Sequence, residues 1–375
     1  MGCQEELLIE KVCEIYDKLS RLENLNPSKQ VNSLFTQLVQ TCKSQCHIDI
    51  TKLNERVQAI RCKLIKLCGK AEGLLEIHFA TLIGSHDKPL NHIKIFPYYS
   101  NYLKLSQVEF SMLNKICSRV PKHIAFVGSG PLPLTSIILA TNHLRTTCFH
   151  NFDIDPSANA KAIQLVSSDS ELSKRMFFHT ADIMNVSSSL RQYEVVFLAA
   201  LVGMDREEKV RVIKHLADHI APGTLLLMRS ANGARAFLYP VIDPCDLQGF
   251  EVLSVFHPSD DVINSVIIAR KNSQGGQSPD GYEPVMHAYQ VEVESKEEQK
   301  VPGKSTTQQV NSTSRGHYLK HRLLITSTKI ILDMALTIKS NLQHAAYQKR
   351  PNSETVAASS DVTRITKEQP SSGRH

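Results

Sequence analysis

Apolar residues recur at helical spacing through the first third of the chain. A predicted first helix carries them every three or four positions, at Leu7, Leu8, Val12, Ile15, Leu19 and Leu22. Such spacing is typical of a helix with one buried face. Asn26-Pro27 then supplies a cap and a first-turn residue for a second helix that runs through Leu38.

Two further helices are predicted before residue 85. The third begins at about Thr51 and ends near Gly69, because glycine is a poor helix former. The fourth carries the apolar residues between Ala71 and Leu82. The stretch 96–102, Phe-Pro-Tyr-Tyr-Ser-Asn-Tyr, breaks the helical pattern and predicts a loop.

A last helix of this first region is predicted to begin at a capping box. Ser106 and Glu109 have the spacing in which each side chain caps the other residue's backbone N–H. The helix then extends to about Arg119. Residues 1–120 are therefore expected to form an N-terminal all-helical domain.

From Pro121 onward, strand-length apolar runs alternate with helical stretches. The predicted strands are 123–127, 147–152, 176–180, 194–200, 224–229, 250–256 and 263–270. The predicted helices are 133–143, 156–167, 206–220 and 232–239. This alternation is typical of an α/β fold with a parallel sheet.

The last two predicted strands have only a short loop between them, beginning at His257-Pro258. They therefore form an antiparallel hairpin at the end of a parallel sheet, as in class I S-adenosylmethionine-dependent transferases. Dinucleotide dehydrogenases usually keep their sheets parallel. The fold class predicted for residues 121–271 is thus a Rossmann-like S-adenosylmethionine-binding domain whose last strand is antiparallel.

Beyond Lys271 the composition becomes polar and rich in Ser, Gly and Gln. Residues 272–375 are expected to form a low-order tail. Within it, apolar residues at helical spacing predict one amphipathic helix at 318–342.

Composition narrows the classes of function. Of the 375 residues, 42% are hydrophobic and 21% are charged, which are the proportions of a globular protein. The net charge is only +6 and the basic residues are scattered, so a nucleic-acid partner is not expected. No apolar run approaches the roughly 20 residues that span a bilayer, so no integral membrane segment is expected. The sequence carries no signal for an oligomeric state.

Cysteine usage indicates a reducing compartment. An odd number of cysteines, nine, without a secretory signal predicts free thiols and a cytoplasmic protein. Two short patterns, Tyr102–Leu105 and Leu74-Leu75, match sorting signals and leave vesicle association as an alternative location. Cys42, Cys46 and His47 lie close together, but no second pair has the spacing of a zinc site, so no metal site is predicted.

The candidate chemistry begins at the first βαβ unit. The strand 123–127 ends in Gly128-Ser129-Gly130, followed by Pro131. Glycines let the backbone pass close to a bound ligand. A dinucleotide turn would have a third glycine and open a helix onto a pyrophosphate. The absence of the third glycine favours an adenosyl ligand without a phosphate. The structural alternative is an ordinary buried βαβ unit with a tight turn and no ligand.

Three acids follow the second and third predicted strands. Asp153 ends the second strand, where a carboxylate can accept both ribose hydroxyls of an adenosine. Asp155 precedes Pro156 and either joins this contact or caps the next helix. Asp182 follows the third strand, where such folds have an acid or amide beside the adenine amino group.

Five stretches carry a resemblance to a known family. They read AEGLLEIHF at 71–79, FPYYSNY at 96–102, AFVGSGPLPLT at 125–135, NFDIDP at 151–156 and LAALVGM at 198–204. On these motifs the chain up to about Lys271 resembles plant nicotianamine synthase. The tail beyond residue 272 does not resemble typical members of that family.

The resemblance implies a reaction. Three S-adenosylmethionine molecules, as substrates, are joined through their 3-amino-3-carboxypropyl groups, and each transfer releases 5′-methylthioadenosine. One group closes as an azetidine ring, which gives nicotianamine, a chelator of iron, zinc, copper and nickel with a role in metal homeostasis. The sulfonium is already an activated electrophile, so no metal cofactor is expected.

The resemblance also suggests roles for individual residues. Glu76 in the LLE motif is expected to be the general base that deprotonates the attacking α-amino group, and Glu72, one turn earlier, is the second choice. Tyr102 is expected to hold the amino or carboxylate group, with Tyr99 second. The structural alternatives are a solvated acid on the helix surface for Glu76 and aromatic packing for the tyrosines.

The donor site then combines the glycine turn and strand ends with the LAALVGM motif. Its expected members are Gly128, Ser129, Gly130, Pro131, Asp153, Asp155, Asp182, Leu198 and Ala199. Two other functions use the same domain. An ordinary S-adenosylmethionine-dependent methyltransferase would need the same donor site, and a degenerate non-catalytic paralogue could keep the pocket while acting as a binding protein.

Overall fold

The computed structural model describes residues 2–44 and 48–273. Four helices form the first part of this range: α1 (Cys3–Leu19), α2 (Lys29–Cys42), α3 (Glu55–Gly84) and α4 (Tyr99–Ile116). Ser28 caps α2 and Asn54 caps α3, each by accepting a bond from a backbone N–H in the first turn. The predicted helix 318–342 and residues 45–47 lie outside the described residues.

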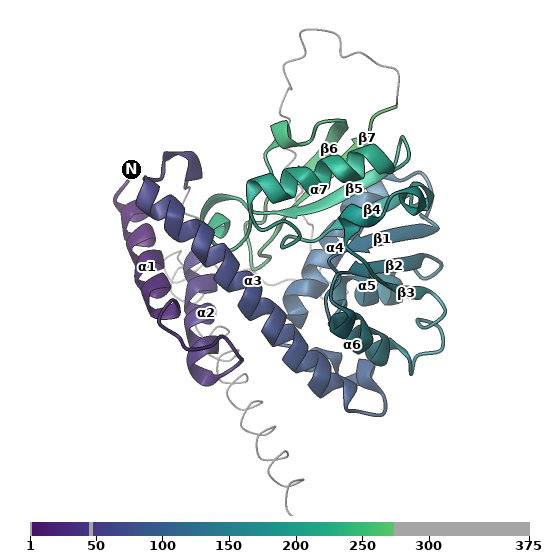
Figure 1. Ribbon diagram of the computed structural model, residues 1–375, viewed down its shortest axis with the longest axis horizontal. Coiled ribbons are helices and arrows are strands. Elements are labelled where there is room, and N and C mark those ends of the chain that lie inside the picture. The colour runs from purple at the N-terminus through teal and green to yellow at the C-terminus, as the bar shows by residue number, and fades with distance from the viewer. Residues whose placement is uncertain (1, 45–47, 274–375) are drawn as a thin grey trace, which may run out of the picture. The chain divides into compact units, whose positions relative to one another are not determined.

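The helix α3 corrects the prediction of two helices separated at Gly69. It is one helix of 30 residues that runs from the α1–α2 pair to α6 (Figure 1). A Cβ added at Gly69 would lie 3.0 Å from Met204 Sδ and 3.5 Å from Leu201 Cδ2. The glycine is therefore a close-approach position within the helix, and its propensity cost of about 1 kcal/mol is too small to end it.

The start of α4 corrects two further predictions. The helix begins at Tyr99, inside the stretch that was expected to be a loop. Ser106 and Glu109 are fully buried in the middle of α4 and form no capping box. Glu109 instead forms an ion pair with Arg229 of the sheet, a partner that local sequence spacing cannot reveal.

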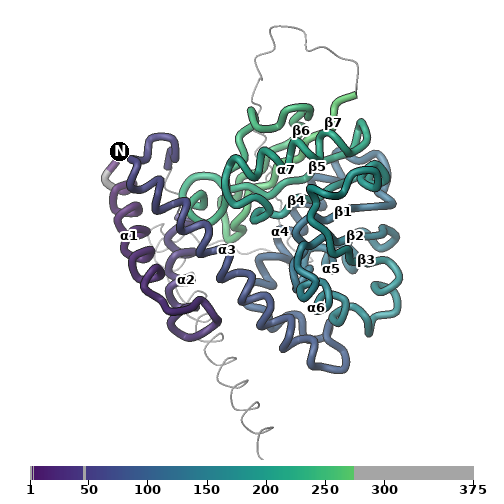
Figure 2. Tube along the Cα trace, in the orientation of Figure 1, coloured from purple at the N-terminus to yellow at the C-terminus, as the bar shows by residue number. Residues whose placement is uncertain are grey.

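The sheet confirms the predicted class. Its seven strands lie in the order β3-β2-β1-β4-β5-β7-β6 (Figures 1 and 2). Their bounds are β1 (His123–Val127), β2 (Cys148–Asp153), β3 (Met176–Thr180), β4 (Val195–Leu198), β5 (Leu225–Ser230), β6 (Phe250–Phe256) and β7 (Ser265–Lys271). The first five strands pair in parallel, and β7 is antiparallel to both of its neighbours, β5 and β6.

The connecting helices agree in position with the prediction but differ in type at two places. As predicted, α6 (Pro156–Val166) and α7 (Arg206–His219) are α-helices. The stretch 133–143 is a short α5 (Leu134–Ile138) followed by a π-helical turn (Leu139–His143). The stretch 232–239 holds a 3₁₀ turn (Gly233–Phe237) instead of an α-helix, and its Arg61 contact, Nε to the Ala236 carbonyl at 2.8 Å, ties it to α3.

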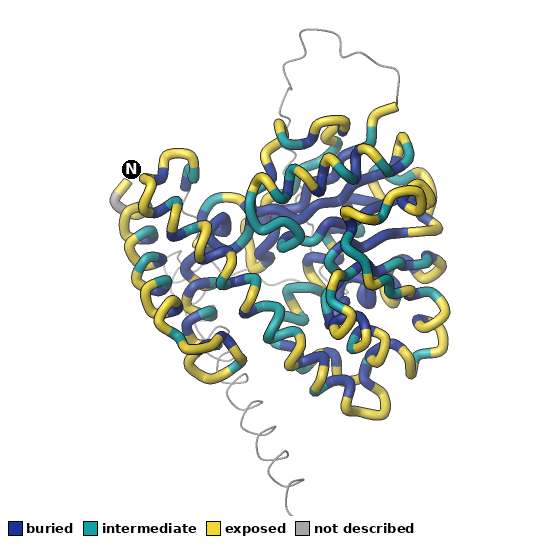
Figure 3. Tube along the Cα trace, viewed as in Figure 1, coloured by how far each residue is buried: buried dark blue, intermediate teal, exposed yellow. Residues whose placement is uncertain are grey.

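Both faces of the sheet are covered, as the buried strands in Figure 3 illustrate. Residues of α3, α4, α5 and α6 pack on one face in a single core that includes Ile124, Phe126 and Ile268. The helix α7 packs on the other face. A third core joins α1, α2 and α3 to the Gly233–Phe237 turn. The N-terminal helices therefore form one side of the space at the edge of the sheet.

Candidate active site

A cavity of about 440 Å³ opens at the carboxyl ends of the parallel strands. Its wall is made by the residues that follow β1, β2, β3 and β4, by the end of β5 and by one side of α3. Ligands of α/β sheets bind at this edge, where the chain order reverses between neighbouring strands. The volume lies at the lower end of the range for small-molecule sites, about 300–1,000 Å³.

The glycine turn after β1 forms the floor of this cavity. Gly128 and Gly130 have φ angles of 79° and 66°, which favour glycine. A Cβ at Gly128 would lie 2.3 Å from Val202 Cγ2, and one at Gly130 would lie 2.8 Å from Glu76 Oε2. The turn therefore needs glycines both for its conformation and for the close approach of two other segments.

Asp153, at the end of β2, holds this turn and faces the cavity. Its Oδ2 accepts a bond from the Gly130 N–H at 2.7 Å, and its Oδ1 accepts one from the Asp155 N–H at 3.0 Å. Each carboxylate oxygen has a second lone pair free for a ligand hydroxyl. Asp155 caps α6 through the Ser157 N–H at 2.8 Å, as predicted, and also lines the cavity.

The remaining predicted donor residues divide into two groups. Ser129, Pro131, Asp182 and Ala199 line the cavity. Leu198 does not, because its side chain is buried in the core beneath α7. Asp182 also caps a 3₁₀ turn by accepting a bond from the Met184 N–H at 3.0 Å.

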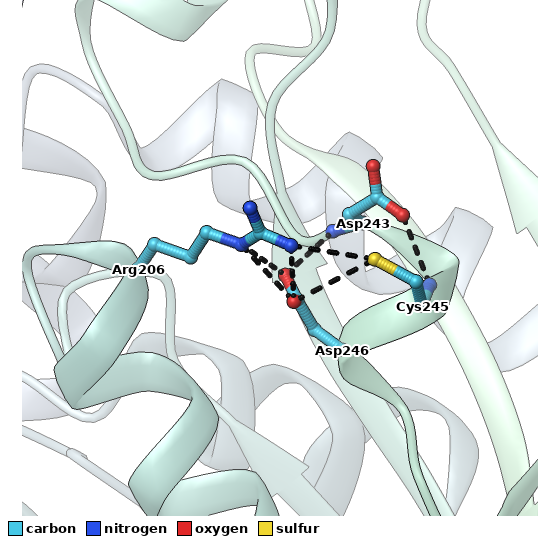
Figure 4. Close-up of polar contacts among 4 residues, drawn as sticks. All are labelled: Arg206, Asp243, Cys245 and Asp246. Atoms are coloured by element: carbon cyan, nitrogen blue, oxygen red, sulfur yellow. Dashed lines mark hydrogen bonds and ion pairs between the residues drawn. The ribbon is translucent and has the colours of Figure 1, made fainter.

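Two side chains of α7, Lys209 and Arg206, form polar contacts near the loop after β4. The fully buried Lys209 donates to the carbonyls of Ala199 and Ala200, at 3.2 and 2.8 Å, and burial lowers the pKa of its ammonium to about 7. At the start of α7, Arg206 binds both carboxylate oxygens of Asp246 (Figure 4). The Lys209 bonds fix the part of the cavity wall that Ala199 and Ala200 form, and the Arg206 ion pair joins the start of α7 to the turn Pro244–Asp246.

Two helices contribute the predicted catalytic pair. Glu76 of α3 and Tyr102 of α4 meet in the cavity, where Tyr102 Oη donates to Glu76 Oε1 at 3.2 Å. The enclosing protein raises the pKa of Glu76 well above its ordinary value of 4.5, and the nearby Glu72 raises it further. Burial likewise raises the pKa of Tyr102, so this phenol is a hydrogen-bond donor at neutral pH.

Glu72 lies one turn before Glu76 and also lines the cavity. It accepts a bond from Tyr239 Oη at 2.9 Å. Burial raises its pKa, although the bond from Tyr239 and the charge of Arg229 act in the opposite direction. Tyr99 is half-buried against the core and is not among the cavity residues.

One guanidinium, that of Arg229, lines the cavity within the described part of the chain. Its Nε and Nη2 bind the fully buried Glu109, at 2.7 and 3.1 Å, and Nη2 also donates to Thr135 Oγ1 at 2.6 Å. Burial alone would lower the pKa of Arg229, but the ion pair outweighs it and the pKa is raised. No described residue bonds to Nη1, which remains available to a ligand.

The charged groups that line the cavity favour a ligand with a particular distribution of charge. Five carboxyl groups line it, those of Glu72, Glu76, Asp153, Asp155 and Asp182, against the single guanidinium of Arg229. A cation that also carries one carboxylate matches this distribution.

The cavity residues that sequence reasoning missed include three with hydrogen-bonding side chains, Arg229, Tyr239 and Asn264. Arg229 had one signal, a charged residue directly after the apolar run 225–228. Tyr239 and Asn264 follow no motif, and only the tertiary structure brings them to the site.

Among residues 2–44 and 48–273, no group of three or more His, Cys, Asp and Glu side chains is arranged to hold a metal ion. Of the sequence neighbours Cys42, Cys46 and His47, for which no metal site was predicted, the last two lie outside this range. Within the same ranges, no helix combines the length and the apolar content needed to cross a membrane.

The sheet order, the antiparallel β7, the glycine turn and the acidic end of β2 together define a class I S-adenosylmethionine-dependent transferase fold. The family model described as "Nicotianamine synthase protein" matches residues 2–275. The chain therefore belongs to the nicotianamine synthase family and is an enzyme of the transferase class.

Curated relatives and solved structures agree with this assignment. The chain is 61% identical over 275 residues to nicotianamine synthase 3 of Arabidopsis thaliana, which covers 72% of this chain and 86% of the relative. It is 62% identical over 264 residues to nicotianamine synthase of Solanum lycopersicum, covering 70% and 83%. A crystal structure of MtNAS in complex with MTA and tNA has the same fold, with a TM-score of 0.60 at 21% identity, covering 70% of this chain and 98% of that chain.

Proposed function

We propose that this protein is a nicotianamine synthase that condenses three S-adenosylmethionine molecules by 3-amino-3-carboxypropyl transfer. Each transfer releases one 5′-methylthioadenosine, and one transferred group closes into the azetidine ring. The family membership supports the activity. A crystal structure of MtNAS in complex with S-adenosylmethionine, with the same fold, supports the identity of the substrate.

The observation that carries the proposal is the meeting of Glu76 with the glycine turn. Glu76 Oε2 lies 2.8 Å from the position of a Cβ on Gly130, and Tyr102 donates to its other oxygen. A donor whose adenosyl group lies along Gly128–Gly130 and Asp153 would then extend its methionine portion toward Glu76. Methyl transfer does not by itself need an α3 carboxylate at this place.

The transfer step balances as a direct substitution. The α-amino nitrogen of the acceptor attacks the donor's Cγ, the N–C bond forms, and the C–S bond breaks. The electron pair of that bond stays on sulfur as the neutral thioether of methylthioadenosine. Before the attack, the acceptor ammonium gives one proton to Glu76, which frees the nitrogen lone pair that forms the N–C bond. For ring closure, the amine and the Cγ belong to the same 3-amino-3-carboxypropyl group.

The raised pKa of Glu76 suits this role. A carboxylate with a high pKa is a stronger base toward an ammonium, once it has lost its own proton. The same shift favours the protonated form of Glu76 in the empty cavity. Entry of a cationic donor favours the ionised form, so we expect donor binding to release that proton.

The substrate carboxylates need a cationic partner, and Arg229 supplies it. Glu109 and Thr135 occupy two of its nitrogens and fix its plane. The remaining Nη1 can donate to a carboxylate oxygen of the donor or of the growing product.

The test is incubation of the purified protein with S-adenosylmethionine, followed by mass spectrometry of the products. We expect nicotianamine and methylthioadenosine. S-adenosylhomocysteine in their place would identify a methyltransferase. Binding of S-adenosylmethionine with no turnover would identify a non-catalytic paralogue.

Several wider expectations accompany this function. Nicotianamine would serve to chelate iron, zinc, copper and nickel in metal homeostasis. We also propose a division of the chain at residues 1–120, 121–271 and 272–375, a cytoplasmic location with vesicle association as the alternative, no metal cofactor and no nucleic-acid partner. Cell fractionation, with a product assay of each fraction, tests the location.

A further inference from the structure

The loop between β6 and β7 ends at Asn264, directly before Ser265. This side chain is only 6% exposed and belongs to the cavity wall. Its Nδ2 is buried and has no hydrogen-bond acceptor among the described residues. A buried donor without an acceptor costs free energy, so such a group is rare unless a ligand satisfies it.

The loop that carries Asn264 is held firmly. Asp261 forms ion pairs with Lys43 at the end of α2 and, at 3.5 Å, with Lys104 of α4. The Ile263 N–H donates to Asn101 Oδ1 of α4 at 3.3 Å, and the Ile263 side chain is buried among α1, α2 and α3. The backbone on both sides of Asn264 is therefore fixed, and the unpaired amide is not a consequence of a loose loop.

Asn264 belongs to the same part of the cavity as Arg229. The antiparallel register pairs Arg229 of β5 with Val266 of β7. Asn264 lies directly before β7, and continuing the strand alternation by one residue turns it to the same side of the sheet as Val266. Asn264 is then the diagonal neighbour of Arg229 on that side.

This position is remote from the adenosyl end of the site. The order β1-β4-β5-β7 separates the end of β7 from the glycine turn after β1 by three strand spacings. At about 4.8 Å per spacing, that separation is roughly 14 Å. A group that binds Asn264 therefore belongs to the far end of the ligand and not to its adenosine.

We propose that Asn264 is a substrate-contacting residue that donates to a carboxylate of the amino-acid acceptor, beside Arg229 Nη1. This inference rests on the proposed function, in which the acceptor is an α-amino acid chain. The terminal torsion of asparagine is soft, so the amide can turn its NH₂ toward a ligand oxygen. Arg229 supplies the charge, and Asn264 supplies the second donor that fixes the direction of the carboxylate.

The experiment measures two affinities by calorimetry in the full-length chain. Methylthioadenosine probes the adenosyl end, and nicotianamine probes the amino-acid end. For Asn264→Ala we expect unchanged affinity for methylthioadenosine and affinity for nicotianamine weakened by about 10- to 100-fold, as for one hydrogen bond to a charged group. Asn264→Asp has the same size but repels a carboxylate, so its loss should be larger.

Asn272, exposed at the opposite end of β7, provides the matched control, and Asn272→Ala and Asn272→Asp should bind both probes as the unchanged chain does. Equal affinity of Asn264→Ala for nicotianamine would overturn the proposal. So would an equal loss for both probes, or loss of folding in both Asn264 variants, because either result would assign the amide a structural role. Failure of the unchanged protein to release methylthioadenosine from S-adenosylmethionine would instead overturn the proposed function.

Discussion

Two glutamates one helical turn apart have the same chemistry but different partners. Glu72 accepts a bond from Tyr239, whereas Glu76 accepts one from Tyr102 and lies against the glycine turn. The turn is where the reactive end of an adenosyl donor would lie. Under the proposed function, this difference in neighbours, and not in residue type, favours Glu76 over Glu72 as the base.

The first prediction concerns catalysis by Glu76. Glu76→Gln keeps size and hydrogen bonding but cannot accept a proton, so methylthioadenosine release should fall by roughly 10²- to 10⁴-fold. Binding of S-adenosylmethionine should persist, and part of the rate should return at high pH, where more of the amine is neutral. A rate equal to that of the unchanged enzyme at neutral pH would move the base to Glu72 or Tyr102.

The second prediction concerns the pH dependence of stability. The pKa of Glu76 is raised in the folded protein above its ordinary value of 4.5. Between that value and the raised pKa, the folded state binds more protons than the unfolded state, so stability falls as pH rises. Glu76→Gln lacks this dependence. In urea titrations without ligand, the variant should therefore be more stable than the unchanged protein at pH 7, with the difference shrinking toward pH 4.

A third prediction separates two neighbouring acids. Asp153→Ala should abolish binding of S-adenosylmethionine in calorimetry, because it removes the ribose acceptor and the bond that holds the Gly130 N–H. Asp155→Ala should mainly remove the cap of α6, at a cost of about 1 kcal/mol of stability. Unchanged affinity in the Asp153 variant would refute its role in the donor site.

At the scale of the element, α3 is the segment that joins the helical region to the chemistry. Its 30 residues carry both Glu72 and Glu76, and its Gly69 lets the loop after β4 approach closely. A break at Gly69, as the sequence suggested, would separate the first half of α3 from the half that lines the cavity. Continuity of this helix therefore fixes the two acids relative to the N-terminal core.

The fourth prediction uses a second glycine of this helix. Gly73 lines the cavity, and a Cβ added there would meet no atom within 4 Å. Gly73→Ala should then stabilise the protein by about 0.5–1 kcal/mol, because alanine loses less backbone entropy in a helix. Gly130→Ala is the contrast, since its φ of 66° and its proximity to Glu76 should make it destabilising. Thermal unfolding of both variants distinguishes these signs.

At the scale of the whole described molecule, one buried ion pair links the helical region to the sheet. Glu109 of α4 is fully buried and binds Arg229 of β5 through two nitrogens. The same arginine lies 5.6 Å from the centre of the Tyr102 ring. The pair therefore aligns α4, the sheet and the cavity.

The fifth prediction follows from this pair. Glu109→Ala would leave the Arg229 charge buried without its partner, which should cost about 3–5 kcal/mol of unfolding free energy. The exposed pair of Glu251 and Arg270 gives the control, and Glu251→Ala should change stability by only about 0–1 kcal/mol. Equal effects in urea unfolding would contradict the structural importance of the buried pair.

Local pattern by itself determined much of this protein. Strand-length apolar runs predicted all seven strands within a few residues, and the short loop before β7 indicated the antiparallel closure. The turn Gly128–Gly130 and Asp153 could be assigned to one ligand site because consecutive parallel strands end at the same edge. Glu76 and Tyr102 came from the resemblance to a family, since an acid or a tyrosine on a helix has no chemical signature of its own.

The tertiary structure decided what depends on contacts between distant segments. It joined two predicted helices into α3, because the packing of Gly69 against Met204 is invisible along the chain. It converted an apparent capping box into the partner of Arg229, and it brought Tyr239 and Asn264 into the cavity. The physical reason is the same in each case: periodicity reports which face of an element is buried, but only packing reports what that face is buried against.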